Sequence, residues 1–319
     1  MNVICAGRNN REFLNRFEDW LYSKWDIVPE YNTCEEYLGR NFSFVIFEND
    51  SKNYMILFDA DDGSGIASDN FKLKIDVFEQ LKKEHNVEDY IVFKMQYSSK
   101  SPHNDYYPLK NKTYPLGYFP YFPDVIENFK HLNRYNFLTT PKDIDFLWMG
   151  TVNVEDKPPV WPANVDLKHW QLGQRIKGFN VLRDIAQRRT DLNVIFTDKR
   201  IPYIDYLRLL MRTKVCIELP GVGNFTTRFF ENLMMGKCII GKELYLELPY
   251  ELLPDIHYIS VDTYDKLEPK MDIVLRNDPL LEDIERNVKK LQPSLTYKYA
   301  YDYILRILKE KKWSKDESN

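Results

Sequence analysis

The sequence predicts an α/β fold of two domains, each built from its own alternation of strands and helices. The chain has 319 residues, which is more than one ordinary hydrophobic core supports, so one large or two medium domains are expected. Short apolar runs alternate with segments whose apolar residues recur at helical spacing, the pattern of α/β layers. A stretch from 98 to 137 with five prolines interrupts this alternation and leads to a linker near 139–142.

The first strand–helix series runs from the amino terminus to the linker. Consecutive apolar residues predict strands at 2–6, 42–47, 54–58 and 90–95. Apolar residues at helical spacing predict helices at 12–24 and 70–85, the second capped by Ser68 or Asp69. We expect a parallel sheet in this series and loops in the proline-rich stretch.

The second series begins directly after the linker. The same criteria predict strands at 144–149, 193–196, 215–219, 238–240 and 257–261, and helices at 172–188, 204–211 and 226–235. Gly236 is a suitable residue to end the last of these helices. Two Rossmann-like domains facing a cleft are therefore expected, one over 1–140 and one over 141–296. A final helix at about 297–312 is expected to return to the first domain.

Composition and charge exclude several classes of protein. The formal net charge is -4, so no basic field attracts a nucleic acid. No run of about 18 apolar residues predicts a membrane span, and the N-terminus shows no apolar leader segment. The four cysteines form no CxxC pair, which is typical of a reducing compartment. We expect a cytoplasmic chain, or one whose anchor has been trimmed.

The strongest candidate site follows the expected strand at 215–219. Pro220, Gly221, Gly223 and Asn224 form a glycine-bearing loop between that strand and the helix at 226–235. The carboxyl ends of strands are where open α/β sheets bind ligands, and glycines let the backbone approach a ligand closely. The N-terminus of the helix favours a phosphate, with Thr226 or Thr227 as N-cap or phosphate contact. The loop matches neither the dinucleotide nor the P-loop fingerprint.

Arg228 and Glu231 give this helix a second signal. A cation in the first helical turn opposes the helix dipole, so Arg228 is better placed with a diphosphate nearby. Glu231 is three residues further on, hence on the same face, and a carboxylate accepts hydrogen bonds from ribose hydroxyls. The alternative is an Arg–Glu surface pair on a capped helix, which is common and contributes little.

At this point the sequence resembles a known family. The matching residues are Phe146-Leu147-Trp148-Met149-Gly150, Arg175, Tyr206 to Leu210, Thr213-Lys214-Val215-Cys216, Pro220 to Glu231 and Gly236-Lys237-Cys238-Ile239-Ile240. They resemble the C-terminal domain of exostosin-like (GT47-type) glycosyltransferases, over roughly a third of the chain. Thr226 stands where that family has a serine, the glycine loop is one residue shorter, and the loop at 151–171 is longer.

The resemblance implies a fold, an activity and a donor site. It implies the two-Rossmann GT-B arrangement and a metal-independent enzyme without a cofactor, whose co-substrate is a nucleotide diphosphate sugar, expected to be UDP-linked. Arg228 would bind the donor diphosphate, Glu231 the ribose and Arg175 a second phosphate position. The other expected donor contacts are Gly221, Gly223, Asn224, Thr226 and Thr227. Inversion at the transferred sugar is likewise only implied by the resemblance.

The first domain offers candidates for the base and the acceptor site. Asp59, Asp61 and Asp62 follow a buried strand, and one of them is the expected base, because adjacent carboxylates raise one another's pKa. A turn of solvated aspartates is the alternative, and His103 is a fallback base. Lys94 lies on an apolar strand, where it either pairs with these carboxylates or binds the acceptor.

The function expected from the sequence is transfer of a sugar to a saccharide acceptor. The acceptor, an oligosaccharide or glycan, is expected on the first domain, beside the tyrosines Tyr106, Tyr107, Tyr118 and Tyr121. Aromatic residues make up 15% of the chain, and core filling explains them equally well. Two alternatives remain open: a sugar-nucleotide epimerase or hydrolase of the same architecture, and a non-catalytic module that binds nucleotide sugars. The sequence leaves the oligomeric state open.

Overall fold

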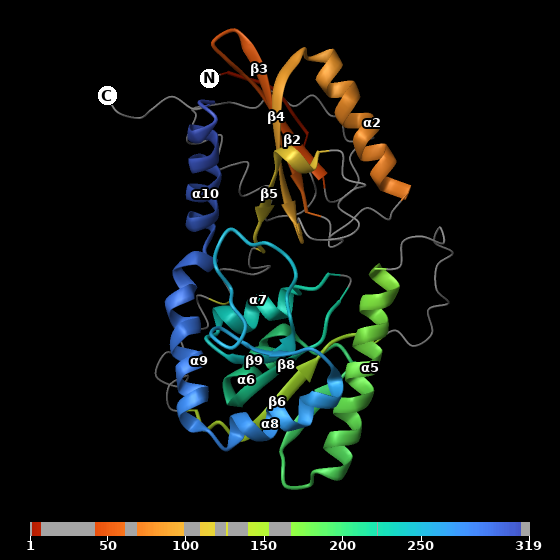
Figure 1. Ribbon diagram of the computed structural model, residues 1–319, viewed down its shortest axis with the longest axis vertical. Coiled ribbons are helices and arrows are strands. Elements are labelled where there is room, and N and C mark those ends of the chain that lie inside the picture. The colour runs from red at the N-terminus through yellow and green to blue at the C-terminus, as the bar shows by residue number, and fades with distance from the viewer. Residues whose placement is uncertain are drawn as a thin grey trace. The chain divides into compact units, whose positions relative to one another are not determined.

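The computed structural model describes residues 2–7, 42–60, 69–98, 109–118, 126, 140–152, 167–221 and 223–313 (Figure 1). The helix expected at 12–24 lies outside these ranges. The chain forms two compact units: unit 1 is Met1–Tyr121, Leu246–Tyr250 and Thr296–Asn319, and unit 2 is Phe122–Tyr245 and Glu251–Leu295. Each unit contains an open sheet covered by helices, which confirms the expected α/β class.

Unit 1 has a mixed sheet rather than the parallel one expected. The order is β1-β2-β3-β4-β5, with β1 (Asn2–Gly7), β2 (Phe42–Asn49), β3 (Lys52–Asp59), β4 (Val87–Met95) and β5 (Thr113–Leu116). The pairs β1/β2 and β2/β3 are antiparallel, whereas β3/β4 and β4/β5 are parallel. Asp50 and Ser51 both have positive φ (52° and 63°). They form the two-residue hairpin turn that reverses the chain between β2 and β3, where no helix intervenes.

Strand β5 corrects the expectation of loops in the proline-rich stretch. It contains Pro115, paired in register with Lys94 of β4. Proline has no backbone N–H to donate, and an edge strand tolerates it because only one side of the strand is paired. The edge position of β5 therefore explains why a proline-containing segment joins the sheet.

The core of unit 1 lies between the sheet and its helices. Helix α2 (Asp69–Glu84) buries Val77, Phe78 and Leu81 against side chains of β2, β3 and β4. Helix α10 (Tyr297–Glu310) belongs to this unit, and the ring of Tyr303 lies 6.3 Å from that of Phe93 in β4. The returning carboxyl end of the chain is thus part of the unit 1 core.

Unit 2 contains an all-parallel sheet of order β10-β9-β8-β6-β7. Its strands are β6 (Ile144–Met149), β7 (Val194–Thr197), β8 (Thr213–Glu218), β9 (Cys238–Lys242) and β10 (Ile259–Val261). Counted in chain order from β6, this is the doubly wound order 2-1-3-4-5, whose topological switch point lies between its first and third strands. Here those strands are β6 and β8, so the fold itself directs attention to their carboxyl ends.

Helices cover both faces of the unit 2 sheet (Figure 1). They are α5 (Leu167–Arg188), α6 (Tyr203–Arg212), α7 (Thr227–Met234), α8 (Leu267–Leu275) and α9 (Asp278–Leu291), with short 3-10 turns at Tyr264–Lys266 and Gln292–Leu295. Right-handed crossovers place α5 on one face and α6 with α7 on the other, because the chain changes direction after β7. None of the described helices is long and apolar enough to cross a membrane.

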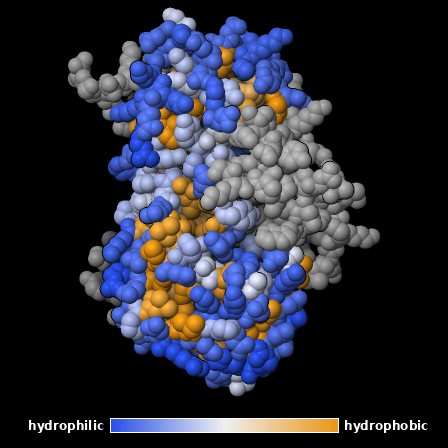
Figure 2. All heavy atoms as spheres, in the orientation of Figure 1, coloured by the Kyte–Doolittle hydropathy of each residue, from blue (hydrophilic) through white to orange (hydrophobic). Residues whose placement is uncertain are grey.

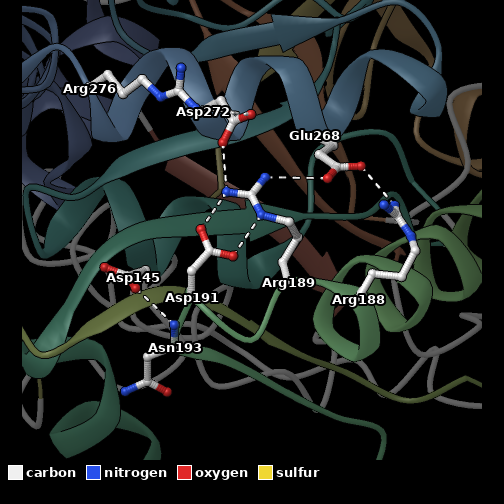
Figure 3. Close-up of polar contacts among 8 residues, drawn as sticks. All are labelled: Asp145, Arg188, Arg189, Asp191, Asn193, Glu268, Asp272 and Arg276. Atoms are coloured by element: carbon white, nitrogen blue, oxygen red, sulfur yellow. Dashed lines mark hydrogen bonds and ion pairs between the residues drawn. The ribbon is translucent and has the colours of Figure 1, made fainter.

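An ion-pair cluster fastens the end of α5 to α8 (Figure 3). The guanidinium of Arg189 lies 2.8 Å from Asp191, 3.3 Å from Glu268 and 3.0 Å from Asp272. Arg188 adds a bond of 2.8 Å to Glu268. Arg189 thus has three carboxylate partners, which serves as a reference for the arginines described below.

The visible surface of unit 2 is hydrophilic with apolar residues gathered on one part of it (Figure 2). Three large aliphatic side chains in the described ranges are exposed, Ile204, Ile256 and Ile273. They come from α6, from the loop before β10 and from α8. Apolar surface of this kind is ordinary in soluble domains, and no ligand site is inferred from it.

Candidate anion-binding site

The residues expected to bind a donor gather at the switch point of unit 2. Gly150 follows β6 directly, and Glu218 is the last residue of β8. The loop after β8 turns back on itself through a hydrogen bond of 2.9 Å from Gly221 N to the Gly223 carbonyl, and then enters α7. The two loops that leave the central parallel strands therefore meet the amino end of a helix at one place.

Thr226 fixes the start of α7. It is the N-cap, and its hydroxyl oxygen accepts a hydrogen bond of 3.1 Å from the backbone N–H of Phe229. The same hydroxyl donates its proton to the carboxylate of Glu218. One of the free N–H groups of the first turn is thereby satisfied. The N–H groups of Thr227 and Arg228 also lie in this first turn, where the helix dipole is positive.

Two arginines approach the switch point through space that two glycines leave open. The Nη2 atom of Arg228 lies 2.8 Å from where a Cβ on Gly150 would stand. The Nη2 atom of Arg175, from α5, lies 2.7 Å from the equivalent position on Gly221. Any side chain at either glycine would displace a guanidinium, so both glycines are needed for this arrangement.

Arg175 also joins the two loops to each other. Its Nε donates to the carbonyl of Pro220 at 2.7 Å, and its Nη1 donates to the carbonyl of Thr151 at 3.1 Å. Pro220 follows β8 and Thr151 follows β6, so this one side chain bridges the switch point. The third nitrogen of the Arg175 guanidinium, Nη2, is directed at Gly221.

Neither arginine has a carboxylate partner in the described part of the chain. All ion pairs found there within 4.0 Å involve other cations, in contrast to Arg189 in Figure 3. The Nε atom of Arg228 is buried and has no hydrogen-bond partner among the described residues. Burial and the charge of Arg228 lower the pKa of Arg175 to about 10. Two guanidinium groups that repel each other are held together with unused donors, which is the chemistry of an anion site.

Two buried carboxylates lie close to these arginines. Burial raises the pKa of Glu218, while the charges of Arg228 and Arg175 and the hydrogen bond from Thr226 oppose that rise. Burial also raises the pKa of Glu231 to about 7, although Tyr203 donates to its Oε1 at 3.0 Å and Arg228 favours its charged form. Glu231 is 5% exposed, so Arg228 and Glu231 do not form the surface pair considered above.

The remaining expected donor contacts differ in their roles. The side-chain amide of Asn224 is engaged with backbone, donating to the Glu243 carbonyl at 3.3 Å and accepting from Tyr245 N at 3.0 Å. It holds the loop after β9 against the glycine loop. Gly223 is buried in the turn of the glycine loop, and Thr227 is the first residue of α7.

Sequence reasoning missed four side chains at this site. Glu218 ends a buried strand with a carboxylate, the same signal that singled out Asp59, and it could have been found that way. Trp148 Nε1 and the Tyr264 hydroxyl are buried without a hydrogen-bond partner in the described residues. A Cβ on Gly150 would meet the Trp148 ring at 2.9 Å, and one on Gly178 would meet the Tyr264 ring at 2.8 Å. Trp148, Tyr264 and the fourth missed side chain, Tyr203, carry no sequence pattern that separates them from aromatic residues of the core.

The candidates in unit 1 are only partly described. Lys94 and Asp59 form a buried ion pair at 3.1 Å, with 3% and 2% of their surfaces exposed. Lys94 thus pairs with Asp59, one of the three expected carboxylates. The buried hydroxyl of Tyr118 accepts a hydrogen bond of 2.8 Å from Gln96. Asp61, Asp62, His103, Tyr106, Tyr107 and Tyr121 lie outside the described residues.

No protein-family model and no curated protein matches the chain. Among solved structures, a glycosyltransferase from Rickettsia africae is 11% identical, covering 74% of this chain and 79% of that one, with a TM-score of 0.39. HepE of Anabaena, in complex with UDP, is 10% identical (76% and 67% covered, TM-score 0.43), as is sucrose-phosphate synthase from Thermosynechococcus elongatus (76% and 78%, TM-score 0.39). Because these TM-scores are below 0.5, the functional conclusion rests on the site.

Proposed function

We propose that this chain is a glycosyltransferase of the GT-B type, similar to the exostosin-like family, that uses a nucleotide diphosphate sugar. The donor binds to unit 2, and UDP is its nucleotide. The observation that carries the proposal is the pair Arg175 and Arg228. Both guanidiniums lie at the amino end of α7 without carboxylate partners in the described chain, and the Nε atom of Arg228 is buried and unpaired.

A diphosphate fits this arrangement better than a single carboxylate does. Two guanidiniums that repel each other are matched by a ligand with two adjacent negative groups, which also accepts hydrogen bonds from the N–H groups that begin α7. Glu231 stands one helical turn beyond Arg228, close enough for their charges to interact. A carboxylate there accepts hydrogen bonds from the hydroxyls of the ribose. One nucleotide is thus recognised at two points of one helix.

The same groups serve the transfer step. The bond between the anomeric carbon and the donor phosphate oxygen breaks, and the nucleoside diphosphate leaves with the electron pair. Arg228 and Arg175 stabilise the charge that develops on the leaving group. The acceptor hydroxyl bonds to the anomeric carbon from the opposite face and gives its proton to a carboxylate, which inverts the configuration. Asp61 and Asp62 are the candidates for this base, since Asp59 is paired with Lys94.

Binding of UDP to purified protein tests the donor site. Replacing Arg228 by Gln removes one charge-assisted contact, so UDP affinity should fall about 10- to 100-fold. Arg208→Gln is the matched control, because Arg208 is an exposed arginine of α6 paired with Asp205 at 2.9 Å. Titration calorimetry gives both affinities. No binding of UDP or any other nucleotide to the unmodified chain would end the proposal.

Release of the sugar distinguishes the alternatives. A transferase should turn over a UDP-sugar panel faster when saccharide acceptors are added, and the sugar should appear on the acceptor. A turnover rate that does not change when acceptors are added would indicate an epimerase or hydrolase. Tight UDP binding with no turnover of any donor, with or without acceptor, would indicate a binding module.

A further inference from the structure

Glu218 has no assigned role so far, and its surroundings are unusual. It ends β8 with 3% of its surface exposed. Its neighbour across the sheet is Gly241 of β9, where a Cβ would stand 3.3 Å from the Cβ of Glu218. Among the described residues, the Thr226 hydroxyl is the hydrogen-bond donor to this carboxylate. A carboxylate in such a place needs a compensating charge.

The charged and titratable groups around Glu218 come from four neighbouring elements and from β8 itself. They are Arg175 of α5, Tyr206 of α6, Arg228 and Glu231 of α7, Tyr264 of the 3-10 turn before α8, and Cys216 of β8 itself. Only the two arginines are cations. Glu218 is therefore the buried carboxyl group that lies within electrostatic reach of both arginines, although it forms an ion pair within 4.0 Å with neither.

A bound diphosphate changes this balance. The two guanidiniums then pair with the diphosphate, and its negative charges lie near Glu218. The carboxylate then loses favourable interactions and gains repulsion, and both effects favour its protonated form. Resting on the proposed function, we propose that Glu218 is an internal counter-anion of Arg175 and Arg228 that takes up one proton when a nucleoside diphosphate binds. The site thereby exchanges its own negative charge for that of the ligand.

The cap of α7 survives this exchange. A protonated carboxyl group keeps an oxygen that accepts the hydrogen bond from Thr226, so the hydroxyl still serves Phe229 N. Glutamine offers the same acceptor without a charge. Glu218→Gln therefore preserves the cap and abolishes the proton uptake, which makes it the matched variant. Glu218 is a positioning residue here, since it acts on the ligand through the two arginines.

Proton uptake is measured by titrating UDP into the full-length protein in buffers of different ionisation enthalpy, at a series of pH values above the ordinary pKa of a glutamate, because burial raises the pKa of Glu218. Per UDP bound, the unmodified protein should take up as much as about one proton more than Glu218→Gln does. As pH rises, the UDP affinity of the unmodified protein should fall more steeply than that of the variant, by as much as about tenfold per pH unit. The ionisation of UDP itself is common to both proteins. Glu231→Gln should retain the extra uptake, which separates the two buried carboxylates.

The outcomes distinguish this proposal from the one on which it rests. Binding with equal proton uptake by both proteins would overturn the role of Glu218 and leave the nucleotide site standing. Absence of UDP binding to the unmodified protein would overturn both. If Glu218→Gln does not fold, Thr226→Val provides the test, because it removes a hydrogen bond that favours the charged carboxylate. The pH range of proton uptake should then move upward, and an unchanged range would refute the proposal.

Discussion

At the scale of the residue, each site arginine depends on a glycine. The Nη2 atoms of Arg175 and Arg228 occupy the places where Gly221 and Gly150 would carry a Cβ. The reason for these glycines is close approach by a side chain, not backbone strain, because neither has a positive φ. The sequence indicates that the backbone is accessible in this loop. It does not indicate that the group approaching it is an arginine from α5.

Gly221→Ala is the cleanest test of this dependence. The added methyl would meet Arg175 Nη2 at 2.7 Å, and its other neighbours are at 3.6 Å or more. The guanidinium must move, whereas the backbone need not. We expect UDP affinity to fall at least about tenfold, which corresponds to about 1.4 kcal/mol, with the midpoint of thermal unfolding nearly unchanged.

Gly173→Ala is the control, since nothing lies within 4 Å of its Cβ position in α5. Alanine in a helix interior should raise stability by about 0.5–1 kcal/mol and leave UDP binding as it is. Calorimetric titration and thermal unfolding of both variants give the comparison. Unchanged affinity in Gly221→Ala would show that Arg175 does not contact the nucleotide.

At the scale of the element, α7 owes its position to Thr226 and its neighbours. Thr226→Ala removes the N-cap and the donor to Glu218, and should cost about 1–2 kcal/mol of unfolding free energy. Asn277→Ala removes the N-cap of α9, which accepts from Leu280 N at 3.2 Å, at a similar cost.

Nucleotide binding separates these two capping variants. Only Thr226→Ala should also weaken UDP binding, because only α7 presents its amino end to the site. Urea unfolding and calorimetric titration measure both quantities. An equal loss of affinity in Asn277→Ala would mean that binding follows general stability and not the cap of α7.

Prediction from sequence succeeded best for elements with a strong local signal. The strand expected at 215–219 and the helix expected at 226–235 correspond to β8 (Thr213–Glu218) and α7 (Thr227–Met234). A buried apolar run, a glycine loop and a threonine cap mark those two elements. The hairpin between β2 and β3 was not predicted. Its turn needs a positive φ at both Asp50 and Ser51, and neither residue is a glycine.

The contacts that build the site were beyond prediction for a different reason. Arg175 and Arg228 were expected to serve one ligand, yet the bonds of Arg175 to the carbonyls of Thr151 and Pro220 join segments 24 and 45 residues away. Such contacts depend on the strand order, and the order that places β6 beside β8 is not encoded in any local pattern. The sequence identified both arginines, and the doubly wound topology brings them together.

At the scale of the whole molecule, the chain leaves and rejoins unit 1 twice. Leu246–Tyr250 belongs to that unit, with Glu247 N donating to the Tyr97 carbonyl at 2.7 Å, and so does Thr296–Asn319. The sequence predicted boundaries at 140 and 296 and a final helix that returns to the first domain. It gave no sign of the short excursion at Leu246–Tyr250, because five residues carry no periodic signal. Every described residue of the candidate anion site lies in unit 2.

That division predicts that unit 1 can be weakened without loss of nucleotide binding. Trp313 is 3% exposed, and its ring lies 4.8 Å from that of Tyr54 and 6.0 Å from that of Phe47. Trp313→Ala should destabilise unit 1 by roughly 3 kcal/mol or more, as expected for a buried tryptophan. Hydrogen exchange should accelerate in β2, β3 and β4 and stay unchanged in β6 and β8, while UDP affinity remains within about twofold. A large fall in affinity in this variant would show that unit 1 supplies part of the nucleotide site.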